Sequence, residues 1–170
     1  MENIDVLISE TKIEKRLDEL AKQIMKDYGD EDLLFIGVLK GAAIFMVELA
    51  KRIKNNVEFE FIQAKSYEGT ESTGKVEITQ DLTGKIDGKN VIIIEDIIDT
   101  GRTLEYLMRY LTFHNPKSIK LCTLLSKPSR RVVELQVDYI GFSIPDEFVI
   151  GYGLDYNQKY RNLPYIGVMK

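Results

Sequence analysis

The stretch that decides the fold is Val91-Ile92-Ile93-Ile94-Glu95-Asp96-Ile97-Ile98-Asp99-Thr100-Gly101-Arg102-Thr103-Leu104. It begins with four β-branched apolar residues, which is typical of a strand buried on both faces of a sheet. Two acids end that run, and a polar segment with one glycine follows. From Leu104 to Leu111, apolar residues recur with the i, i+3, i+4, i+7 spacing of an amphipathic helix. The stretch therefore predicts a strand, a short polar loop and the N-terminus of a helix.

The junction between this strand and this helix is a candidate anion site. The first turn of a helix presents unpaired N–H groups and about half a positive charge. Gly101 permits close backbone approach or a positive φ, and the hydroxyls of Thr100 and Thr103 add donors. A phosphate group fits these donors. The glycine spacing matches neither the dinucleotide fingerprint nor the P-loop.

The carboxylates beside this loop need a separate explanation. Glu95, Asp96 and Asp99 would repel a phosphate, because two unit charges about 4 Å apart interact by roughly 4 kcal/mol at an effective dielectric near 20. Acids are favourable there if they bond hydroxyls or face a cation, so a ligand with a phosphate, a diol and Mg2+ accounts for the whole set. The alternative is that Glu95 and Asp96 only end a strand while Thr100 caps a helix.

Composition limits the class of protein. We expect residues 1–170 to form a single domain, and 44% hydrophobic and 29% charged residues are ordinary for a globular protein. The only cysteine, Cys122, lies in an apolar run and is expected to be buried and inert. No stretch approaches 18 apolar residues and the N-terminus lacks a signal-peptide core, so a cytoplasmic protein without a membrane partner is expected. A net charge of −4 argues against a general nucleic-acid surface.

The rest of the chain alternates strand and helix patterns, which predicts an α/β fold with a mainly parallel sheet. A capping box at Thr11–Glu14 predicts the start of a first helix that ends at Tyr28, and a second helix is expected at Ala42–Ile53. From Lys65 to Lys75 the pattern dissolves, which indicates a long loop, either functional or passive. Further strands are expected at Val6–Ile8, Leu33–Leu39, Val57–Phe61, Val76–Ile78, Ser118–Leu125, Val137–Phe142, Phe148–Gly153 and Tyr165–Val168.

Residues Glu95–Thr103 resemble the phosphoribosyl-diphosphate motif of the type I phosphoribosyltransferases, and within them they are most similar to the hypoxanthine-guanine phosphoribosyltransferases. The resemblance implies a central, mainly parallel twisted sheet flanked by helices, with a small hood formed by the terminal segments. It also implies Mg2+-dependent transfer of 5-phosphoribose from its 1-diphosphate to hypoxanthine or guanine, giving IMP or GMP and pyrophosphate. Small-molecule substrates, no nucleic-acid partner and a homodimer or homotetramer are the corresponding expectations.

The resemblance also implies a role for each residue of the site. Asp99 would lie near purine N7 as the catalytic acid–base group, and Arg102 stands where the family often has lysine. The residues that would hold the 5-phosphate are Asp99, Thr100, Gly101, Arg102 and Thr103. Those on the diphosphate would be Leu39, Lys40, Gly41, Ser66, Tyr67 and Arg161, with a cis Leu39–Lys40 bond and a lid at Ser66–Tyr67. The purine would contact Lys127 through its 6-oxo group, Phe148 by stacking, Val149 and Asp155, and Glu95, Asp96 and Asp155 would lie on the ribose and metal side.

Simpler interpretations stay open for several of these residues. Leu39–Gly41 fits an ordinary strand-to-helix turn, Lys127 an exposed strand end, and Phe148 a core position. For the whole chain, one alternative is a regulator that keeps the fold and binds RNA or protein. Another is a doubly wound nucleotide-binding switch protein, which would leave Phe148, Lys127 and Arg161 unexplained.

Overall fold

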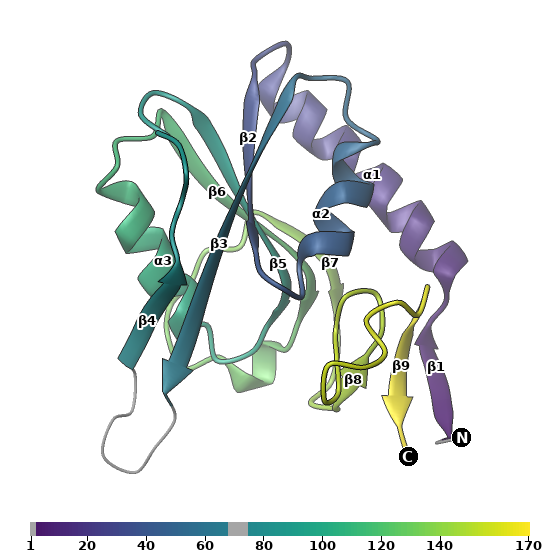
Figure 1. The fold of residues 1–170 in the computed structure, drawn as a ribbon. Coiled ribbons are helices and arrows are strands. Elements are labelled where there is room, and N and C mark those ends of the chain that lie inside the picture. The colour runs from purple at the N-terminus through teal and green to yellow at the C-terminus, as the bar shows by residue number, and fades with distance from the viewer. Residues whose placement is uncertain (1–2, 68–74) are drawn as a thin grey trace.

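The computed structural model describes residues 3–67 and 75–170, and its main element is a six-stranded sheet (Figure 1). The strand order is β4-β3-β2-β5-β6-β7, in which β4 pairs antiparallel with β3 and all the other neighbours are parallel. The strands are β2 (Leu33–Val38), β3 (Val57–Tyr67), β4 (Lys75–Gln80), β5 (Asn90–Ile98), β6 (Ser118–Ser126) and β7 (Tyr139–Ser143). The predicted α/β fold with a mainly parallel sheet is confirmed.

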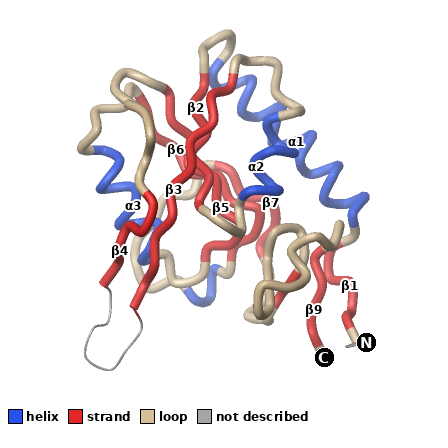
Figure 2. Tube along the Cα trace, in the orientation of Figure 1, coloured by secondary structure: helices blue, strands red, loops and turns tan. Residues whose placement is uncertain are grey.

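Helices cover both faces of this sheet, as Figure 2 shows. Helices α1 (Glu10–Tyr28) and α2 (Ala43–Ala50) lie on one face, and α3 (Arg102–Thr112) lies on the other. The side chains of β5 alternate between the two layers: Ile92 and Ile94 pack with α1 and α2, while Val91 and Ile93 pack with α3. All four are fully buried, as their sequence predicts. Each such side chain contributes about 1.5–3 kcal/mol by leaving water, which makes β5 the centre of the core.

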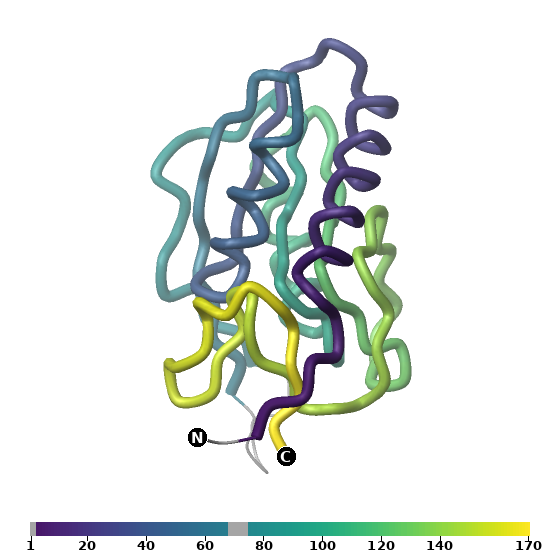
Figure 3. Tube along the Cα trace, turned by 90° about the vertical axis from the view of Figure 1, so that its right-hand side faces the viewer, coloured from purple at the N-terminus to yellow at the C-terminus, as the bar shows by residue number. Residues whose placement is uncertain are grey.

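The terminal segments form a second, smaller sheet with the order β1-β9-β8. Strand β1 (Ile4–Ile8) pairs antiparallel with β9 (Ile166–Met169), which also pairs antiparallel with β8 (Val149–Ile150). Figure 3 shows the first and last described residues lying side by side at one end of the molecule. This is the hood expected of the terminal segments. Within the described residues, no helix is long and apolar enough to cross a membrane.

Helix α1 begins two residues earlier than the predicted capping box. Its N-cap is Ser9, whose hydroxyl accepts a hydrogen bond from the Lys12 N–H at 3.3 Å, and Thr11 lies inside the helix. The capping-box prediction at Thr11 was therefore wrong. Both residues stand near the start of the apolar pattern, and the choice between them depends on β1, which ends at Ile8 and leaves Ser9 extended.

Other predicted boundaries also shift. Helix α2 is shorter than expected, since the chain leaves the helix after Ala50. Strand β3 continues through Lys65 to Tyr67 because β4 pairs with it, so these residues are strand and not loop; the rest of the expected loop, residues 68–74, lies outside the described residues. Strand β5 runs on to Ile98, which places both acids inside the strand. The strand expected at Phe148–Gly153 is reduced to the two residues of β8.

The cap at Ser9 is testable by stability. Because the Ser9 hydroxyl satisfies an otherwise unpaired N–H of the first turn, we expect Ser9→Ala to lower the free energy of unfolding by about 1 kcal/mol. Thr11→Ala is the matched control and should cost less, since alanine has the higher helix propensity. Denaturant unfolding of both variants measures the difference. A larger loss from Thr11→Ala than from Ser9→Ala would contradict the cap observed here.

Candidate functional site

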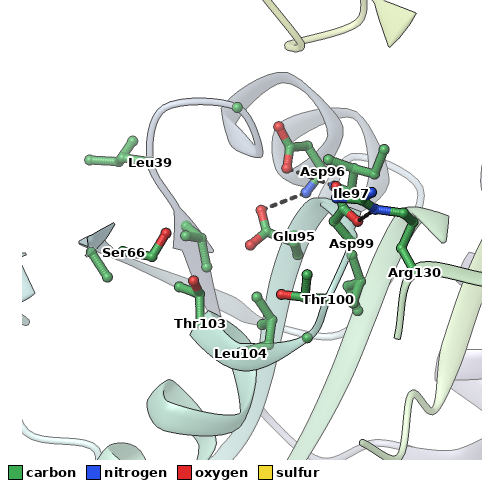
Figure 4. Close-up of a pocket in the computed structure, with 15 residues that line it drawn as sticks. Leu39, Ser66, Glu95, Asp96, Ile97, Asp99, Thr100, Thr103, Leu104 and Arg130 are labelled. Carbon is green, nitrogen blue, oxygen red and sulfur yellow. Dashed lines mark hydrogen bonds and ion pairs between the residues drawn. The ribbon is translucent and has the colours of Figure 1, made fainter. Parts of the chain in front are cut away.

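A cavity opens at the carboxyl edge of the sheet, where β2 and β5 separate (Figure 4). The two strands pair as far as Gly37 and Ile94, and beyond this point β5 pairs only with β6. The resulting hollow has a volume of about 280 Å³. In open α/β sheets, ligands bind at this edge. The predicted site residues that line the cavity are Leu39, Gly41, Ser66, Glu95, Asp96, Asp99, Thr100, Gly101 and Thr103.

The floor of this cavity is the predicted anion loop between β5 and α3. Gly101 is the N-cap of α3, with φ of +88°, and its carbonyl accepts the Glu105 N–H. The positive φ favours glycine, and a Cβ at this position would also crowd the Arg131 side chain at 3.0 Å. Thr100, Gly101 and Thr103 line one hollow at the first turn of α3 (Figure 4), where helix N–H groups lack partners within the helix, and the Thr100 hydroxyl accepts the Arg102 N–H at 3.5 Å. This arrangement suits an anion such as a phosphate.

The segment after β6 braces the loop from behind. The Lys127 N–H donates to the Ile98 carbonyl at 3.0 Å, and the Val132 N–H donates to the Thr100 carbonyl at 3.1 Å. Between them, the Arg131 guanidinium donates to the Ser126 hydroxyl at 2.8 Å. Because these bonds occupy backbone carbonyls on both sides of the loop, its conformation is set before any ligand arrives.

Two adjacent carboxyl groups, Glu95 and Asp96, line the wall of the cavity on β5. Oε1 of Glu95 accepts the Asp96 N–H at 2.9 Å, and Oδ1 of Asp96 accepts the Ile97 N–H at 2.6 Å. Burial raises the pKa of the Glu95 carboxyl well above its usual range, and the charge of Asp96 adds to the rise. Burial also raises the pKa of Asp96, although Glu95, the Ile97 N–H and the nearby Arg161 charge oppose it. The pair is therefore a place where a proton or a metal cation is favoured.

The turn after β2 packs directly against this pair. The Leu39–Lys40 peptide bond is cis, as the resemblance implies. A Cβ on Gly41 would overlap the carboxylate of Asp96, and a Cβ on Gly153 would overlap the carbonyl of Gly41. Gly41 is thus held between the acid pair and the segment that follows β8, and no side chain larger than hydrogen fits.

The C-terminal segment contributes a group of charged side chains next to this turn. Arg161 donates to the Gly153 carbonyl at 2.7 Å and lies 3.5 Å from Oδ1 of Asp155. Oε1 of Gln158 accepts from Arg161 at 3.2 Å and from the ammonium of Lys40 at 3.5 Å. Lys40 and Arg161 therefore share one neutral acceptor. This places both predicted diphosphate-binding cations together, outside the lining of the cavity.

The residues expected to bind a base follow the anion loop in the sequence, after β6 and around β8. Lys127 is almost fully buried, with its ammonium 3.5 Å from Oδ1 of Asp146, so the exposed strand end considered above is wrong for this residue. Phe148 is 56% exposed and meets Tyr156 edge to face at a centroid distance of 5.8 Å, so it is not a core residue. Val149 is buried in β8. An exposed aromatic face and a buried ammonium are suitable for a planar polar ligand.

Not every predicted residue lines the cavity. Among the described residues, Lys40, Tyr67, Arg102, Lys127, Phe148, Val149, Asp155 and Arg161 stand outside its lining. The Tyr67 hydroxyl donates to Glu77 on β4 at 2.7 Å, which fixes it to the edge of the sheet. The predicted lid that includes Ser66 and Tyr67 continues into residues 68–74, outside the described residues.

Arg130 lines the cavity but was missed by the sequence analysis. It lies in a one-turn 3-10 helix, Pro128–Arg130, and its Nε donates to Oδ1 of Asp99 at 2.9 Å (Figure 4). The available signal was its spacing: Arg130 follows three residues after Lys127, at the end of a strand that reaches the same edge. One 3-10 turn spans three residues, so a turn that begins after Lys127 brings Arg130 back toward that edge.

The donor set fits a metal that a substrate brings with it. Within residues 3–67 and 75–170, no three or more Asp, Glu, His or Cys side chains gather closely enough to hold a metal ion. Mg2+ is commonly held by one or two carboxylates together with substrate oxygens. The adjacent carboxyls of Glu95 and Asp96 meet that requirement, and the predicted contribution of Asp155 stays a prediction.

Most of the chain is similar to proteins of one known family. Residues 5–157 match the family described as phosphoribosyl transferase domain. The chain is 49% identical to the hypoxanthine-guanine phosphoribosyltransferase of Bacillus subtilis over 166 residues, which cover 97% of this chain and 92% of that protein. It is equally identical to the bifunctional protein TilS/HprT of Listeria monocytogenes, but spans only 26% of its length.

Solved structures agree with this match. A crystal structure of a hypoxanthine-guanine phosphoribosyltransferase from Bacillus anthracis superposes with a TM-score of 0.94 at 49% identity, over 99% of this chain and 98% of that chain. A hypoxanthine phosphoribosyltransferase from Staphylococcus aureus gives a TM-score of 0.93 at 47% identity, over 98% and 91% of the two chains.

The acid pair generates a stability prediction with a defined pH dependence. Because the pKa of Glu95 is raised in the folded protein, folding favours the protonated carboxyl, and this contribution is lost as pH rises through the folded pKa. Glu95→Gln removes the ionisation and keeps an acceptor for the Asp96 N–H. We expect it to raise Tm by roughly 2–4 °C at pH 8, and by less near pH 5.

Thermal unfolding at both pH values measures this effect. Glu134→Gln, at an exposed position, is the matched control and should leave Tm unchanged. An equal gain at both pH values, or a loss at pH 8, would contradict the raised pKa of the buried Glu95 carboxyl.

Proposed function

The chain belongs to the phosphoribosyl transferase domain family, and on that premise we propose that it transfers 5-phosphoribose from 5-phosphoribosyl 1-diphosphate to N9 of hypoxanthine or guanine. The products are IMP or GMP and pyrophosphate. The relatives that it covers almost completely carry the name hypoxanthine-guanine phosphoribosyltransferase, which supports a 6-oxopurine as the acceptor. This places the protein in purine salvage as a pentosyl glycosyltransferase.

One observation carries the proposal: an anion loop, the buried Glu95 and the half-buried Asp96 line the same cavity. The N-terminus of α3, with Thr100, Gly101 and Thr103, supplies donors for the 5-phosphate. Glu95 and Asp96 lie beside it, at a place that suits the two ribose hydroxyls. A phosphorylated ribose combines these two groups in one small molecule.

The reaction forms a bond between N9 of the base and C1 of the ribose and breaks the bond between C1 and the diphosphate oxygen. Positive charge grows on the ribose as the diphosphate leaves, so the site must hold the leaving group and exclude water. Lys40 and Arg161 supply positive charge for the diphosphate, next to the turn at Gly41. When bound, Mg2+ neutralises the charge of the leaving group.

The base is recognised by polarity and stacking. The buried ammonium of Lys127 donates and cannot accept, so it suits the 6-oxo group of hypoxanthine or guanine and not the 6-amino group of adenine. The exposed ring of Phe148 offers a stacking surface, and base stacking contributes about 1–3 kcal/mol. Main-chain groups of Val149 lie next to this ring along the chain, with Asp155 further on for the base or the metal.

The remaining expectations follow from the same assignment. Substrates and products are small molecules, and the proposal includes no nucleic-acid or membrane partner. The proposal also includes a cytoplasmic location and assembly into a homodimer or homotetramer. Gel filtration with light scattering measures the oligomeric state.

The proposed activity is tested by pyrophosphate release from 5-phosphoribosyl 1-diphosphate with Mg2+ present. We expect release with guanine and with hypoxanthine, little with adenine, and none after chelation of the metal. A regulator of the same fold would bind the sugar diphosphate without releasing pyrophosphate, so absence of release together with binding would reject the transferase. Turnover of adenine equal to that of guanine would remove Lys127 from base selection.

The side chain of Asp99 is predicted to act on the base, whereas the part of Asp99 in holding the 5-phosphate is assigned to the backbone of the anion loop. Asp99→Asn keeps the size of the side chain and removes its ability to take a proton from the base at N7. We expect kcat to fall about 10-fold to 100-fold, within the range of general acid–base contributions, with the binding of 5-phosphoribosyl 1-diphosphate retained. Steady-state kinetics and calorimetric titration separate the two effects. Complete loss of sugar-diphosphate binding would reject the assignment.

A further inference from the structure

Four charged side chains form a row along the carboxyl edge of the sheet. Nε of Arg130 lies 2.9 Å from Oδ1 of Asp99, and its Nη1 lies 3.7 Å from Oδ2 of Asp146. The other oxygen of Asp146, Oδ1, lies 3.5 Å from the ammonium of Lys127. We call this row, Asp99–Arg130–Asp146–Lys127, the ionic chain. Its two ends are the residues to which the proposed function assigns the acid and the cation that face the base.

The members of the ionic chain come from three neighbouring strand ends. Asp99 follows β5, Lys127 and Arg130 follow β6, and Asp146 follows β7. The Arg130 N–H donates to the Lys127 carbonyl at 3.0 Å, which closes the 3-10 turn and fixes the spacing of the two cations. The ionic chain is thus built from short segments anchored by buried strands, and not from a long loop.

Charge and shape explain why an arginine occupies the middle of the row. The four side chains carry two positive and two negative charges, so the row is neutral. A guanidinium presents five N–H donors in one plane and contacts two carboxylates from different sides, whereas an ammonium acts as a point charge. The Arg130 and Asp99 side chains are 48% and 44% exposed, so their pairing contributes modestly to stability. The effect of this pairing on the position of the Asp99 carboxylate is therefore more important than its effect on stability.

We propose that Arg130 and Asp146 are positioning residues for the purine base. Arg130 fixes the carboxylate of Asp99, and Asp146 fixes the ammonium of Lys127. The contact between Arg130 and Asp146 couples these two positions. The inference rests on the proposed function, which assigns Asp99 and Lys127 to the base. The inference adds that Arg130 and Asp146 affect the binding of the base alone, because the 5-phosphate is held by the backbone and hydroxyls of the anion loop.

The test compares the kinetic constants for the two substrates in Arg130→Ala. We expect kcat/KM for guanine to fall roughly threefold to tenfold, the effect of one half-exposed ion pair on a catalytic group, with KM for 5-phosphoribosyl 1-diphosphate within a factor of two of the original. Arg130→Lys should recover part of the loss, because lysine pairs with one carboxylate only. Arg109→Ala, which removes a surface arginine of α3, is the matched control and should change neither constant.

A double-mutant cycle tests the coupling. Asp146→Asn should also lower kcat/KM for guanine, and the double variant with Arg130→Ala should lose less than the product of the two single effects. Thermal unfolding of each variant shows that the fold is retained.

The outcomes separate this inference from the proposed function. If the original protein releases no pyrophosphate, the proposed function fails and the inference fails with it. If the original protein is active and Arg130→Ala matches it, only the inference fails. A rise confined to KM for 5-phosphoribosyl 1-diphosphate would also overturn it, since Arg130 would then be a phosphate ligand. Multiplicative effects in the cycle would overturn the coupling.

Discussion

The burial of β5 on both faces is the constraint on which the rest of the structure depends. Val91–Ile94 pack with α1 and α2 on one side of the sheet and with α3 on the other. A strand covered on both faces has no place for polar side chains along its length, so its charged residues collect where the covering helices end. The acids, the anion loop and the start of α3 occupy that end. The position of the site is therefore a result of how the core is packed.

The separation of β2 from β5 turns this edge into a hollow. Their pairing stops at Gly37 and Ile94, and beyond that point the buried Glu95 and the half-buried Asp96 have no neighbouring strand on the β2 side. Burial raises the pKa values of both carboxyl groups, so charge on this pair is unfavourable unless a ligand compensates it. Functional sites often carry local destabilisation of this kind, since a ligand that relieves it gains affinity. The tightly packed surroundings of Gly41 keep the acids from relaxing outward.

Sequence reasoning recovered the strongly patterned parts of the molecule and missed those that depend on pairing. The apolar run at Val91–Ile94 and the spacing of Leu104–Leu111 predicted β5 and α3 because burial imposes a period on the sequence. The extension of β3 to Tyr67 has no such period, since this exposed end of the strand is held by backbone hydrogen bonds to the edge strand β4. Likewise, the loop residues of the candidate site were predictable from helix-terminus chemistry. Arg130 was not, because its role depends on a contact with Asp99, 31 residues away.

The close approach of Gly153 to Gly41 has a consequence for the order in which the chain folds. The two glycines are far apart in the sequence, yet Gly153 packs directly against the backbone carbonyl of Gly41. During synthesis from the N-terminus, all six strands of the main sheet, β2 to β7, precede residue 153, so this sheet has its full set of strands first. Contacts between distant parts of the chain form slowly, because a large loop must close before they contribute. The hood, together with the segment after β8 that packs on Gly41, is therefore assembled last. A nascent chain has a folded core before it has a complete site.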